Sequence, residues 1–443
     1  FDLNRDWAWQ TQAETQQRLK VYHQWMPHIH VDYHEQFPNN PYYFAPAAAP
    51  FHEYINEWQR EFQYDIGQNH AKYFDQNGWL YFTREVFDLL YPSYGDTYPL
   101  FHGAIGMTHE QAGHGIAGRA YITENGDTLT LSDRIAHHTT TALSTVEVAS
   151  KNADRIVSQF EDYYRSGMES PQGEYKTYIV KASNPARQLQ SLCKLLDKNY
   201  IKYRKAESPM KVNAFHYQEN KKQSCQVEEG DLIISAYQPM SVMVQVLFDP
   251  EPVLEDTLTY DITAWALPYA YVLDAFATSQ RISSNTAFSF PPYRKASAEN
   301  APYAFAAAWT SLADAQFLGH LLKKGIKTRF AKAPFSLEGQ QYPAGTLLIT
   351  KADNRKNKEW ANTSRRVAAD HQKVLQTMQT GFSDSGADLG SDMMSYLEAP
   401  KVALLSGETT SMQMSAGPII AVSVREPGLL ARIICRSGSR TTS

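Results

Sequence analysis

Four short segments of this 443-residue chain carry side chains that could bind and transform a small polar substrate. Asn4 and Arg5 stand near its start, and an arginine presents a planar fork that binds a carboxylate through two hydrogen bonds. His34 offers a nitrogen suited to a metal ion, and Tyr91 offers a phenol that can donate to a developing oxyanion. Glu110 offers a carboxylate that can accept and return a proton. Together these residues predict an anion-binding site beside a site of metal-assisted hydrolysis.

The order of these segments is more specific than any one of them. Asp2-Leu3-Asn4-Arg5 comes first, followed by the run His28–His34, then Tyr91-Pro92-Ser93-Tyr94-Gly95, then Thr108-His109-Glu110-Gln111. In this order they resemble the zinc carboxypeptidases of the carboxypeptidase A type, and especially a large secreted bacterial branch of that superfamily. The resemblance covers roughly residues 1–125, which would be the later part of that catalytic domain.

The resemblance implies a role for each candidate residue. His34 matches the third zinc ligand of the family, a histidine at the end of a strand, and Glu110 matches the general base. Asn4 and Arg5 match the pair that holds the free C-terminal carboxylate of a peptide, and Tyr91 matches the phenol that closes over bound substrate. The implied activity is zinc-dependent hydrolysis of a peptide bond near that carboxylate, in a secreted or periplasmic protein.

One part of the family pattern has no counterpart in this sequence. The first two zinc ligands of the family come from a His-x-x-Glu motif upstream of the Asn-Arg pair, and no such motif precedes Arg5. We therefore expect the missing ligands to lie before residue 1, and we interpret the chain as an N-terminally truncated catalytic domain. Because a catalytic zinc takes three protein ligands, residues 1–443 alone are expected to bind Zn²⁺ weakly and to show little or no peptidase activity.

Some neighbouring residues compete with these candidates. Tyr94 and Tyr98 are close rivals of Tyr91 for the role of the phenol. His109-Glu110-Gln111-Ala112-Gly113-His114 resembles HExxH but is one residue too long. On a helix, two residues five positions apart are separated by ~140°, so His109 and His114 would not share a metal.

Each candidate also has an ordinary structural explanation. Arg5 could simply pair with Asp2 or Asp6, and Glu110 could pair with Arg119 or with a basic residue upstream. The histidine could be hydrogen-bonded at the edge of a sheet. Only the combined order of the segments favours the functional interpretation over these alternatives.

Composition excludes several classes of function. The formal net charge is −5, which provides no electrostatic basis for binding nucleic acid or an anionic membrane surface. No run approaches the ~20 apolar residues that a membrane-spanning helix requires. The cysteines Cys193, Cys225 and Cys435 are widely spaced and form no metal-binding motif, so one disulfide is the most they could make.

Periodicity predicts an α/β protein. In the first part of the chain we expect helices over 6–26 and 51–77, one or two helices over 131–168, and a strand over 28–33 with His34 at its end. A short strand is expected to run into Glu110. The resemblance makes this region an incomplete carboxypeptidase-like mixed sheet with flanking helices.

The chain is long enough for two or three domains. Residues 1–168 are assigned to the C-terminal part of the catalytic domain, and 175–390 to an accessory α/β domain with a helix over 303–324. Residues 351–395 are polar and predict a linker. Residues 398–443 are assigned to the start of a third α/β unit that ends in a truncated or aberrant tail.

Two other functions remain compatible with these residues. The first is an amidase or deacylase that acts on acylated amino acids or cell-wall peptides with the same groups. The second is a non-catalytic protein that binds peptides or glycans on a decayed peptidase fold, which the many aromatic residues would suit. Substrate profiling separates the first alternative from a carboxypeptidase, and an intact upstream His-x-x-Glu would argue against the second.

Overall fold

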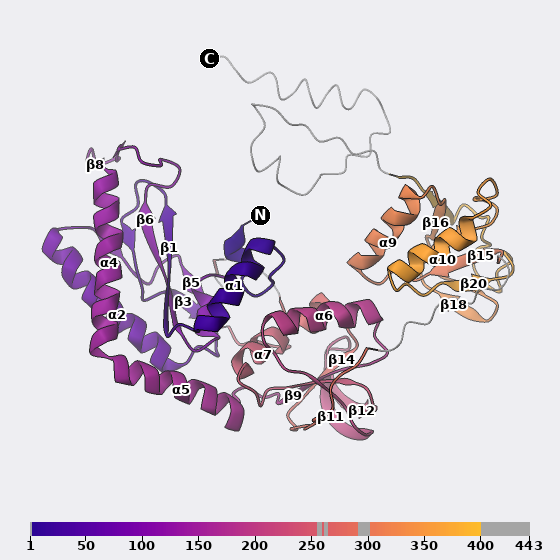
Figure 1. Cartoon of the computed structure of the whole chain (residues 1–443), viewed down its shortest axis with the longest axis horizontal. Helices are drawn as coiled ribbons and strands as arrows, with labels where there is room; N and C mark the ends of the chain where they lie inside the picture. Colours follow the sequence, from indigo (N-terminus) through magenta and orange to yellow (C-terminus); the bar gives the residue numbers. More distant parts are fainter. Residues whose placement is uncertain (1, 255–258, 261–264, 291–301, 400–443) are drawn as a thin grey trace, which may run out of the picture. The chain divides into compact units, whose positions relative to one another are not determined.

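A computed structural model of the chain describes residues 2–254, 259–260, 265–290 and 302–399. Its contacts divide them into two compact units. The larger comprises Asp2–Asn184 and Gln188–Phe290, and the smaller comprises Pro185–Arg187 and the described residues beyond 301. Helices and several sheets occur in both, so the chain has a mixed α/β fold (Figure 1).

The first part of the larger unit contains one mixed sheet and the helices that surround it. Its elements are η1 (Leu3–Arg5), α1 (Ala13–Trp25), β1 (Ile29–Gln36), β2 (Tyr42–Tyr43), β3 (Ala48–Phe51), α2 (Glu57–Asn77), β4 (Tyr81–Phe82), β5 (Asp88–Leu89), α3 (Thr97–Leu100), β6 (Ile105–Ala112), β7 (Tyr121–Ile122), β8 (Thr128–Leu129), α4 (Leu131–Lys151) and α5 (Ala153–Glu169). The expected helices and strands are therefore present, with boundaries shifted by a few residues. The helix expected over 6–26 is shorter, because residues 6–12 form turns in which the carboxylate of Asp6 accepts hydrogen bonds from the backbone nitrogens of Thr11 and Gln12.

The sheet has the order β1-β6-β2-β4, and β1 runs parallel to β6. Every residue of β6 is buried, whereas most residues of β1 are half-buried, as befits a strand at the edge. In the register of this pair, His34 lies opposite Glu110 and Asp32 lies opposite Thr108. Because side chains alternate along a strand, these four residues share one face of the sheet.

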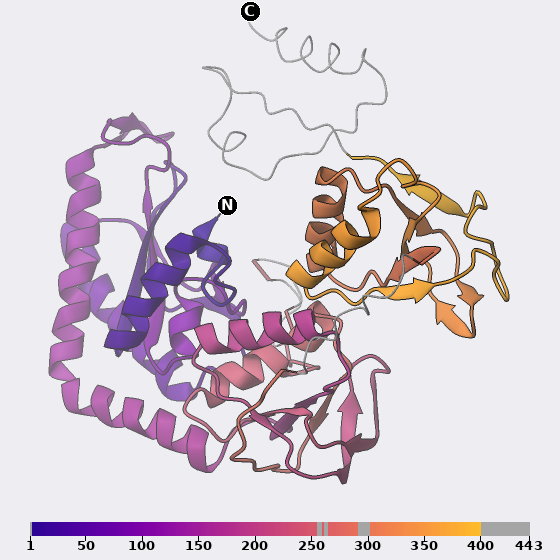
Figure 2. The ribbon, with the colours of Figure 1, turned by 45° about the vertical axis from the view of Figure 1, so that its right-hand side comes forward.

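The other face of this sheet is apolar and is covered by helices. Ile29 and Val31 of β1 and Ile105 and Met107 of β6 pack with buried residues of α2, α4 and α5. Figure 1 shows α2 and α4 side by side along the sheet. The face that carries His34 and Glu110 is thereby left to the N-terminal segment, and Figure 2 shows α1 in front of it.

The start and end of α2 follow from local sequence. Asn56 accepts a hydrogen bond from the backbone nitrogen of Gln59, whose side chain accepts one from the backbone nitrogen of Asn56, which forms a capping box. Gly78 ends the helix in the left-handed conformation, with φ 68°. This helix carries Phe62 and Ile66, both fully buried, onto the apolar face of the sheet.

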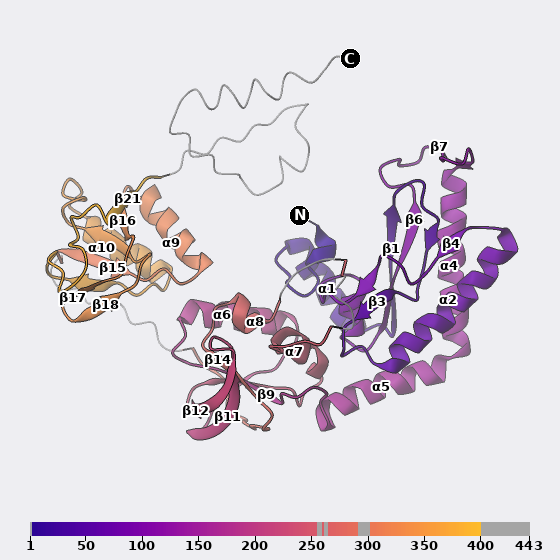
Figure 3. The same cartoon turned by 180° about the vertical axis from the view of Figure 1, so that it is seen from behind.

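The second part of the larger unit is built on an antiparallel sheet of order β10-β13-β9-β14-β11-β12. Figure 3 shows α6 and α7 on one side of it. The elements are β9 (Thr177–Val180), α6 (Ala186–Lys198), β10 (Arg204–Lys205), β11 (Met210–His216), β12 (Lys221–Val227), β13 (Leu232–Ser235), α7 (Ser241–Phe248), α8 (Leu267–Ala270) and β14 (Ala275–Thr278). The strand and helix expected after residue 175 are confirmed as β9 and α6.

The two parts of the larger unit share one hydrophobic core. Trp7 and Tyr98 from the first part belong to the same buried cluster as Tyr178 and Phe248 from the second. Asn199 joins the two parts by hydrogen bonds: its side-chain nitrogen donates to the carbonyl of residue 8 at 3.0 Å, and its oxygen accepts from the hydroxyl of Tyr98 at 2.9 Å. The second part therefore helps to hold the N-terminal segment that carries Asn4 and Arg5.

The smaller unit has a five-stranded sheet of order β20-β15-β19-β16-β21. Its elements are β15 (Ala304–Ala307), α9 (Leu312–Lys323), β16 (Thr328–Ala331), β17 (Phe335–Leu337), β18 (Gln340–Tyr342), β19 (Leu347–Thr350), α10 (Trp360–Asp370), β20 (Gln376–Met378) and β21 (Met394–Leu397). Helices α9 and α10 cover one face, and the hairpin β17–β18 packs on the other. Figures 1 and 2 show α9 and α10 next to each other.

Several expectations for residues 175–399 need correction. The single accessory domain expected over 175–390 contains two sheets that belong to two different compact units. The linker expected over 351–395 contains α10, in which buried Trp360, Ser364 and Val367 recur at helical spacing within a polar stretch. The helix expected over 303–324 is instead strand β15 followed by α9. The third unit expected over 398–443 lies almost entirely outside the described residues.

Two expectations drawn from composition can be compared with the described residues. Among them, no helix combines the length and hydrophobicity needed to cross a bilayer. Cys193 and Cys225 are buried and carry free thiols, while Cys435 lies outside the described residues.

Buried histidines should make the larger unit sensitive to acid. Burial lowers the pKa of His52, His70 and His102 to about 3 each. Each is neutral in the folded chain but binds a proton in the unfolded chain below about pH 6.5. Stability is therefore retained above pH 6.5 and falls as the pH drops toward 3, with each histidine costing on the order of 2 kcal/mol at pH 5.

The measurement is the free energy of unfolding by urea between pH 7.5 and 4.5, for the wild type and for His70→Gln. The free energy of unfolding of the variant should fall less steeply as the pH drops, because unfolding of the variant takes up about one proton fewer. Identical slopes for the two proteins would contradict the assignment of His70 as a buried neutral group.

Candidate functional site

Four of the five predicted site residues line one cavity of about 350 Å³ in the larger unit. They are Asn4, Arg5, His34 and Glu110. The other lining residues are Asp2, Glu35, Phe87, Asp88, Tyr94, Asp96, Thr108, His114 and Tyr260. Acidic residues and an arginine thus face each other across a small polar space.

His34 is held by a carboxylate from its own strand. Its Nε2 lies 2.9 Å from Oδ2 of Asp32 and 3.3 Å from the side-chain nitrogen of Asn4. Asp32 precedes His34 by two residues, so the two side chains point to the same face of β1. The hydrogen bond to Asp32 raises the pKa of His34, and the charges of Glu110 and Asp96 add to the shift.

Glu110 is a buried carboxyl group next to this histidine. It is 8% exposed, and its Oε2 has no hydrogen-bond partner among the described residues. Burial raises the pKa of Glu110 to about 7; His34 opposes the shift, while Asp32 and Asp96 reinforce it. A carboxyl group with this pKa can both accept and return a proton near neutral pH. The expected alternative, a pairing of Glu110 with Arg119, is not observed in the described part of the chain.

Asp96 is a second buried carboxyl group that lines the same cavity as Glu110. It accepts hydrogen bonds from the hydroxyls of Thr108 at 2.8 Å and Thr97 at 3.0 Å. Burial raises the pKa of Asp96 to about 6, which these hydrogen bonds partly oppose. The site therefore concentrates carboxyl groups that resist ionisation, because burial disfavours their charged forms and neighbouring carboxylates add to this effect.

The N-terminal segment brings Asn4 and Arg5 to the same cavity. The side-chain oxygen of Asn4 accepts a hydrogen bond from the backbone nitrogen of Gly95 at 2.6 Å. A Cβ atom at position 95 would stand 2.0 Å from Oδ2 of Asp32, so any larger residue there would have to displace the carboxylate that contacts His34. Arg5 lies over the ring of Tyr94 at 4.6 Å and 3.4 Å from Asp2, the pairing that the sequence offers as an ordinary alternative.

Tyr91 is the predicted residue that does not line the cavity. Its hydroxyl accepts a hydrogen bond from the indole nitrogen of Trp9 at 2.6 Å. Its rival Tyr94 does line the cavity, with its ring against Arg5. The role predicted for Tyr91 stays a prediction, and Tyr94 is the phenol nearer to the other candidates.

The residues described here fit only part of a zinc site. Catalytic zinc takes three protein ligands, and the described residues contain no group of three histidines, cysteines or acids arranged to hold a metal. His34 is one suitable ligand, but its Nε2 is engaged by Asp32, and a ligating imidazole must be neutral. We therefore assign no chemical step to a metal in this cavity.

Sequence reasoning missed several residues of this site. Asp32 could have been found, because a residue two positions before His34 on a strand must share its face. His114 also lines the cavity, although the helical spacing argument set it aside; residues 105–112 form a strand, and a turn then returns His114 to the site. Asp96 and Thr108 gave no signal, since their contact depends on the packing of the loop before β6.

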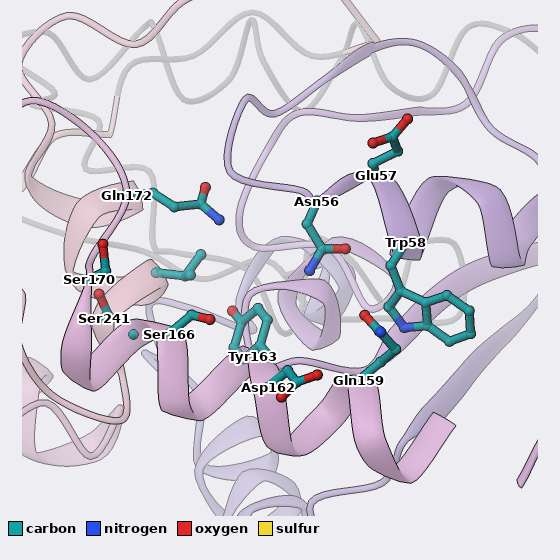
Figure 4. Close-up of a pocket in the computed structure, with 12 residues that line it drawn as sticks. Asn56, Glu57, Trp58, Gln159, Asp162, Tyr163, Ser166, Ser170, Gln172 and Ser241 are labelled. Carbon is teal, nitrogen blue, oxygen red and sulfur yellow. The ribbon is translucent and has the colours of Figure 1, made fainter. Parts of the chain in front are cut away.

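Another cavity of the larger unit, about 300 Å³, lies between the starts of α2 and α7 and the end of α5 (Figure 4). Hydroxyl and amide groups dominate its lining, with Glu57 and Asp162 as its acids. No histidine, arginine or lysine is among the lining residues. It therefore offers fewer groups for proton transfer or anion binding than the cavity of His34 and Glu110, which we take as the candidate site.

Comparisons with protein-family models, with curated proteins and with solved structures found no match to this chain. The function of the cavity is therefore argued from its own residues.

The buried carboxyl groups predict an unusual pH dependence of stability. Because the pKa of Glu110 is raised from 4.5 to about 7, the folded chain keeps this proton over a range in which the unfolded chain has lost it. The contribution of Glu110 to the free energy of unfolding is therefore fully present below pH 4.5 and is lost as the pH rises through 7. Replacing Glu110 by glutamine removes the cost of ionisation, so the variant should gain relative stability with rising pH, by up to about 3 kcal/mol at pH 8.

The check is urea unfolding of the wild type and Glu110→Gln at pH 4.5, 6 and 8. The exposed Glu85→Gln is a matched control that should not change the pH profile. The free energies of unfolding of Glu110→Gln and the wild type could differ by the same amount at all three pH values. That result would contradict the burial of an ionisable group at this position.

Proposed function

We propose that the cavity around His34 and Glu110 is the substrate-binding and proton-transfer part of a zinc-dependent, carboxypeptidase-like hydrolase. The substrate would be a peptide, cleaved near its free C-terminal carboxylate. The observation that carries this proposal is the convergence of Asn4, Arg5, His34 and Glu110 on one cavity, from three segments distant in sequence.

Arg5 and Asn4 would bind the terminal carboxylate. The guanidinium of Arg5 already lies on the cavity wall, oriented by the ring of Tyr94 and by the carbonyl of Asn4, which its Nη1 contacts at 3.3 Å. A substrate carboxylate would compete with Asp2, which is well exposed, for this guanidinium. Arginine–carboxylate pairs in a partly dry cavity form short, charge-assisted hydrogen bonds.

Glu110 would handle the proton. Its Oε2, which has no hydrogen-bond partner among the described residues, and its raised pKa suit a group that takes a proton from water and returns it to the leaving amine. Ionised Glu110 is the base, so any hydrolysis it assists should rise with pH through about 7. Asp32 would hold the ring of His34 in place.

The parallel pairing of β1 with β6 supports the proposal that this sheet is carboxypeptidase-like. A candidate metal ligand stands on one strand, and a candidate base stands opposite it on the next. His34 would be one ligand of the zinc ion. Two binding measurements come before the assay of hydrolysis. They are the affinity for a peptide with a free carboxylate and the affinity for zinc.

Carboxylate recognition is testable without turnover. A short peptide with a free C-terminus should bind the chain at least about tenfold more tightly than its C-terminal amide, because a charge-assisted hydrogen bond contributes about 1.5–3 kcal/mol. Arg5→Gln should remove this preference and Glu110→Gln should keep it. Isothermal titration calorimetry with both peptides makes the comparison.

The control for this experiment is Arg119→Gln, which removes an exposed arginine that does not line the cavity. It should leave the preference intact. Equal affinity of the wild type for the acid and the amide would defeat the assignment of Arg5 and Asn4.

Zinc binding by residues 1–443 should be weak. Because the described residues contain no group of three histidines, cysteines or acids arranged to hold a metal, the dissociation constant is expected to exceed about 1 µM, well above that of complete structural sites. His34→Ala should weaken it further, as measured by competition with a fluorescent zinc chelator. Submicromolar affinity that His34→Ala leaves unchanged would rule out His34 as the ligand.

Hydrolysis in the presence of added zinc decides between an enzyme and a binding protein. Cleavage of the acid peptide that falls at least about 100-fold in Glu110→Gln would support Glu110 as the base. Tight binding of the acid peptide with no cleavage at any zinc concentration would favour a peptide-binding protein.

A further inference from the structure

A third cavity of the larger unit, about 250 Å³, has a strongly basic lining. Lys202, Arg204 and Arg281 line it, and no aspartate or glutamate is among its lining residues. The hydroxyl of Ser283 and the amide of Asn285 add neutral hydrogen-bond donors. In a chain of net charge −5, such a concentration of positive charge calls for an explanation.

The cavity lies at one edge of the six-stranded sheet of the second part. Arg204 stands on the edge strand β10, opposite Ile233 of β13. Lys202 comes just before that strand, and Arg281 lies in the segment after β14. Residues from three separate places in the sequence therefore meet at one end of the sheet.

The three cations differ from the lysines around them. Lys181 forms an ion pair with Asp231, and Lys205 forms one with Glu229 at 3.2 Å. Within the described residues, no carboxylate forms an ion pair with Lys202, Arg204 or Arg281. Like charges around a small cavity repel each other, and an anion bound between them would relieve this repulsion.

The backbone on one side of the cavity is held firmly. Gln238 is 5% exposed and uses both ends of its amide. Its oxygen accepts a hydrogen bond from the backbone nitrogen of Lys202 at 2.7 Å. Its nitrogen donates to the carbonyls of Lys202 at 3.0 Å and Ser235 at 2.6 Å.

The segment that contains Ser284 and Asn285 is held by a carboxylate outside the lining. Oε1 of Glu207 accepts hydrogen bonds from the backbone nitrogens of Asn285 at 2.9 Å and Thr286 at 3.2 Å. Arg281 lies over the ring of Tyr237 at 4.1 Å, so one face of its guanidinium is supported by an aromatic ring. A stacked guanidinium keeps its edge free to donate to an anion.

We propose that this cavity binds the phosphate group of a small anionic ligand. A phosphate carries close to two negative charges near neutral pH and several acceptor oxygens, so it can engage two arginines, a lysine and a hydroxyl together. A single carboxylate would satisfy fewer of these donors. The phosphate could be free or esterified, and the site is independent of the cavity of His34 and Glu110.

The test is isothermal titration calorimetry of the chain with inorganic phosphate and with glycerol 3-phosphate, at constant ionic strength set with chloride. We expect saturable binding that weakens at least about tenfold in the triple variant Lys202→Gln, Arg204→Gln, Arg281→Gln. Tighter binding of glycerol 3-phosphate would indicate an ester as the ligand, and equal binding would indicate free phosphate. Acetate should bind more weakly than either.

A charge-matched control lies at the other edge of the same sheet. The triple variant Lys211→Gln, Lys221→Gln, Lys222→Gln removes three charges from the hairpin β11–β12. It should bind phosphate like the wild type. Equal weakening in both triple variants, or no binding by the wild type at millimolar phosphate, would overturn the proposal. Circular dichroism of each variant confirms that the sheet is intact.

Discussion

The candidate site depends on one interaction, the parallel pairing of β1 with β6. Its register sets His34 opposite Glu110 and Asp32 opposite Thr108. A shift of one residue would turn each of these side chains of β1 toward the helices and would expose Ile29 and Val31 on the other face. The apolar contacts of Ile29, Val31, Ile105 and Met107 with the helices therefore enforce the geometry of the polar face.

The N-terminal segment brings a positive charge to the polar face of the sheet. Glu110 and Asp96 are buried carboxyl groups whose pKa values are raised mainly by burial, with smaller contributions from neighbouring carboxylates. Arg5 brings a positive charge to the wall of this cavity, and Asn4 bridges His34 and the backbone of Gly95. The same segment is anchored through Asn199 to the second part of the unit. Residues far from the cavity thus help to position its cation.

Sequence reasoning reached much of this arrangement. The apolar periodicities predicted the main helices and strands of the first 170 residues, and the ordered segments predicted that Asn4, Arg5, His34 and Glu110 would meet. It failed where local composition is misleading. The polar run around α10 hides a buried stripe that includes Trp360 and Val367, and the helical spacing argument for His114 does not apply to a strand and turn.

The sequence by itself determined the mixed α/β class, the types of chemical groups and their order along the chain. Only the tertiary structure decided which groups meet. Asp96 reaches Thr108 through loop packing, and Tyr94 lines the cavity while Tyr91 bonds to Trp9. Lys202, Arg204 and Arg281, which form no ion pair within the described residues, gather at a sheet edge. The physical reason is that such contacts depend on how non-local backbone segments pack together. Periodicity reports only which face of its own element a residue occupies.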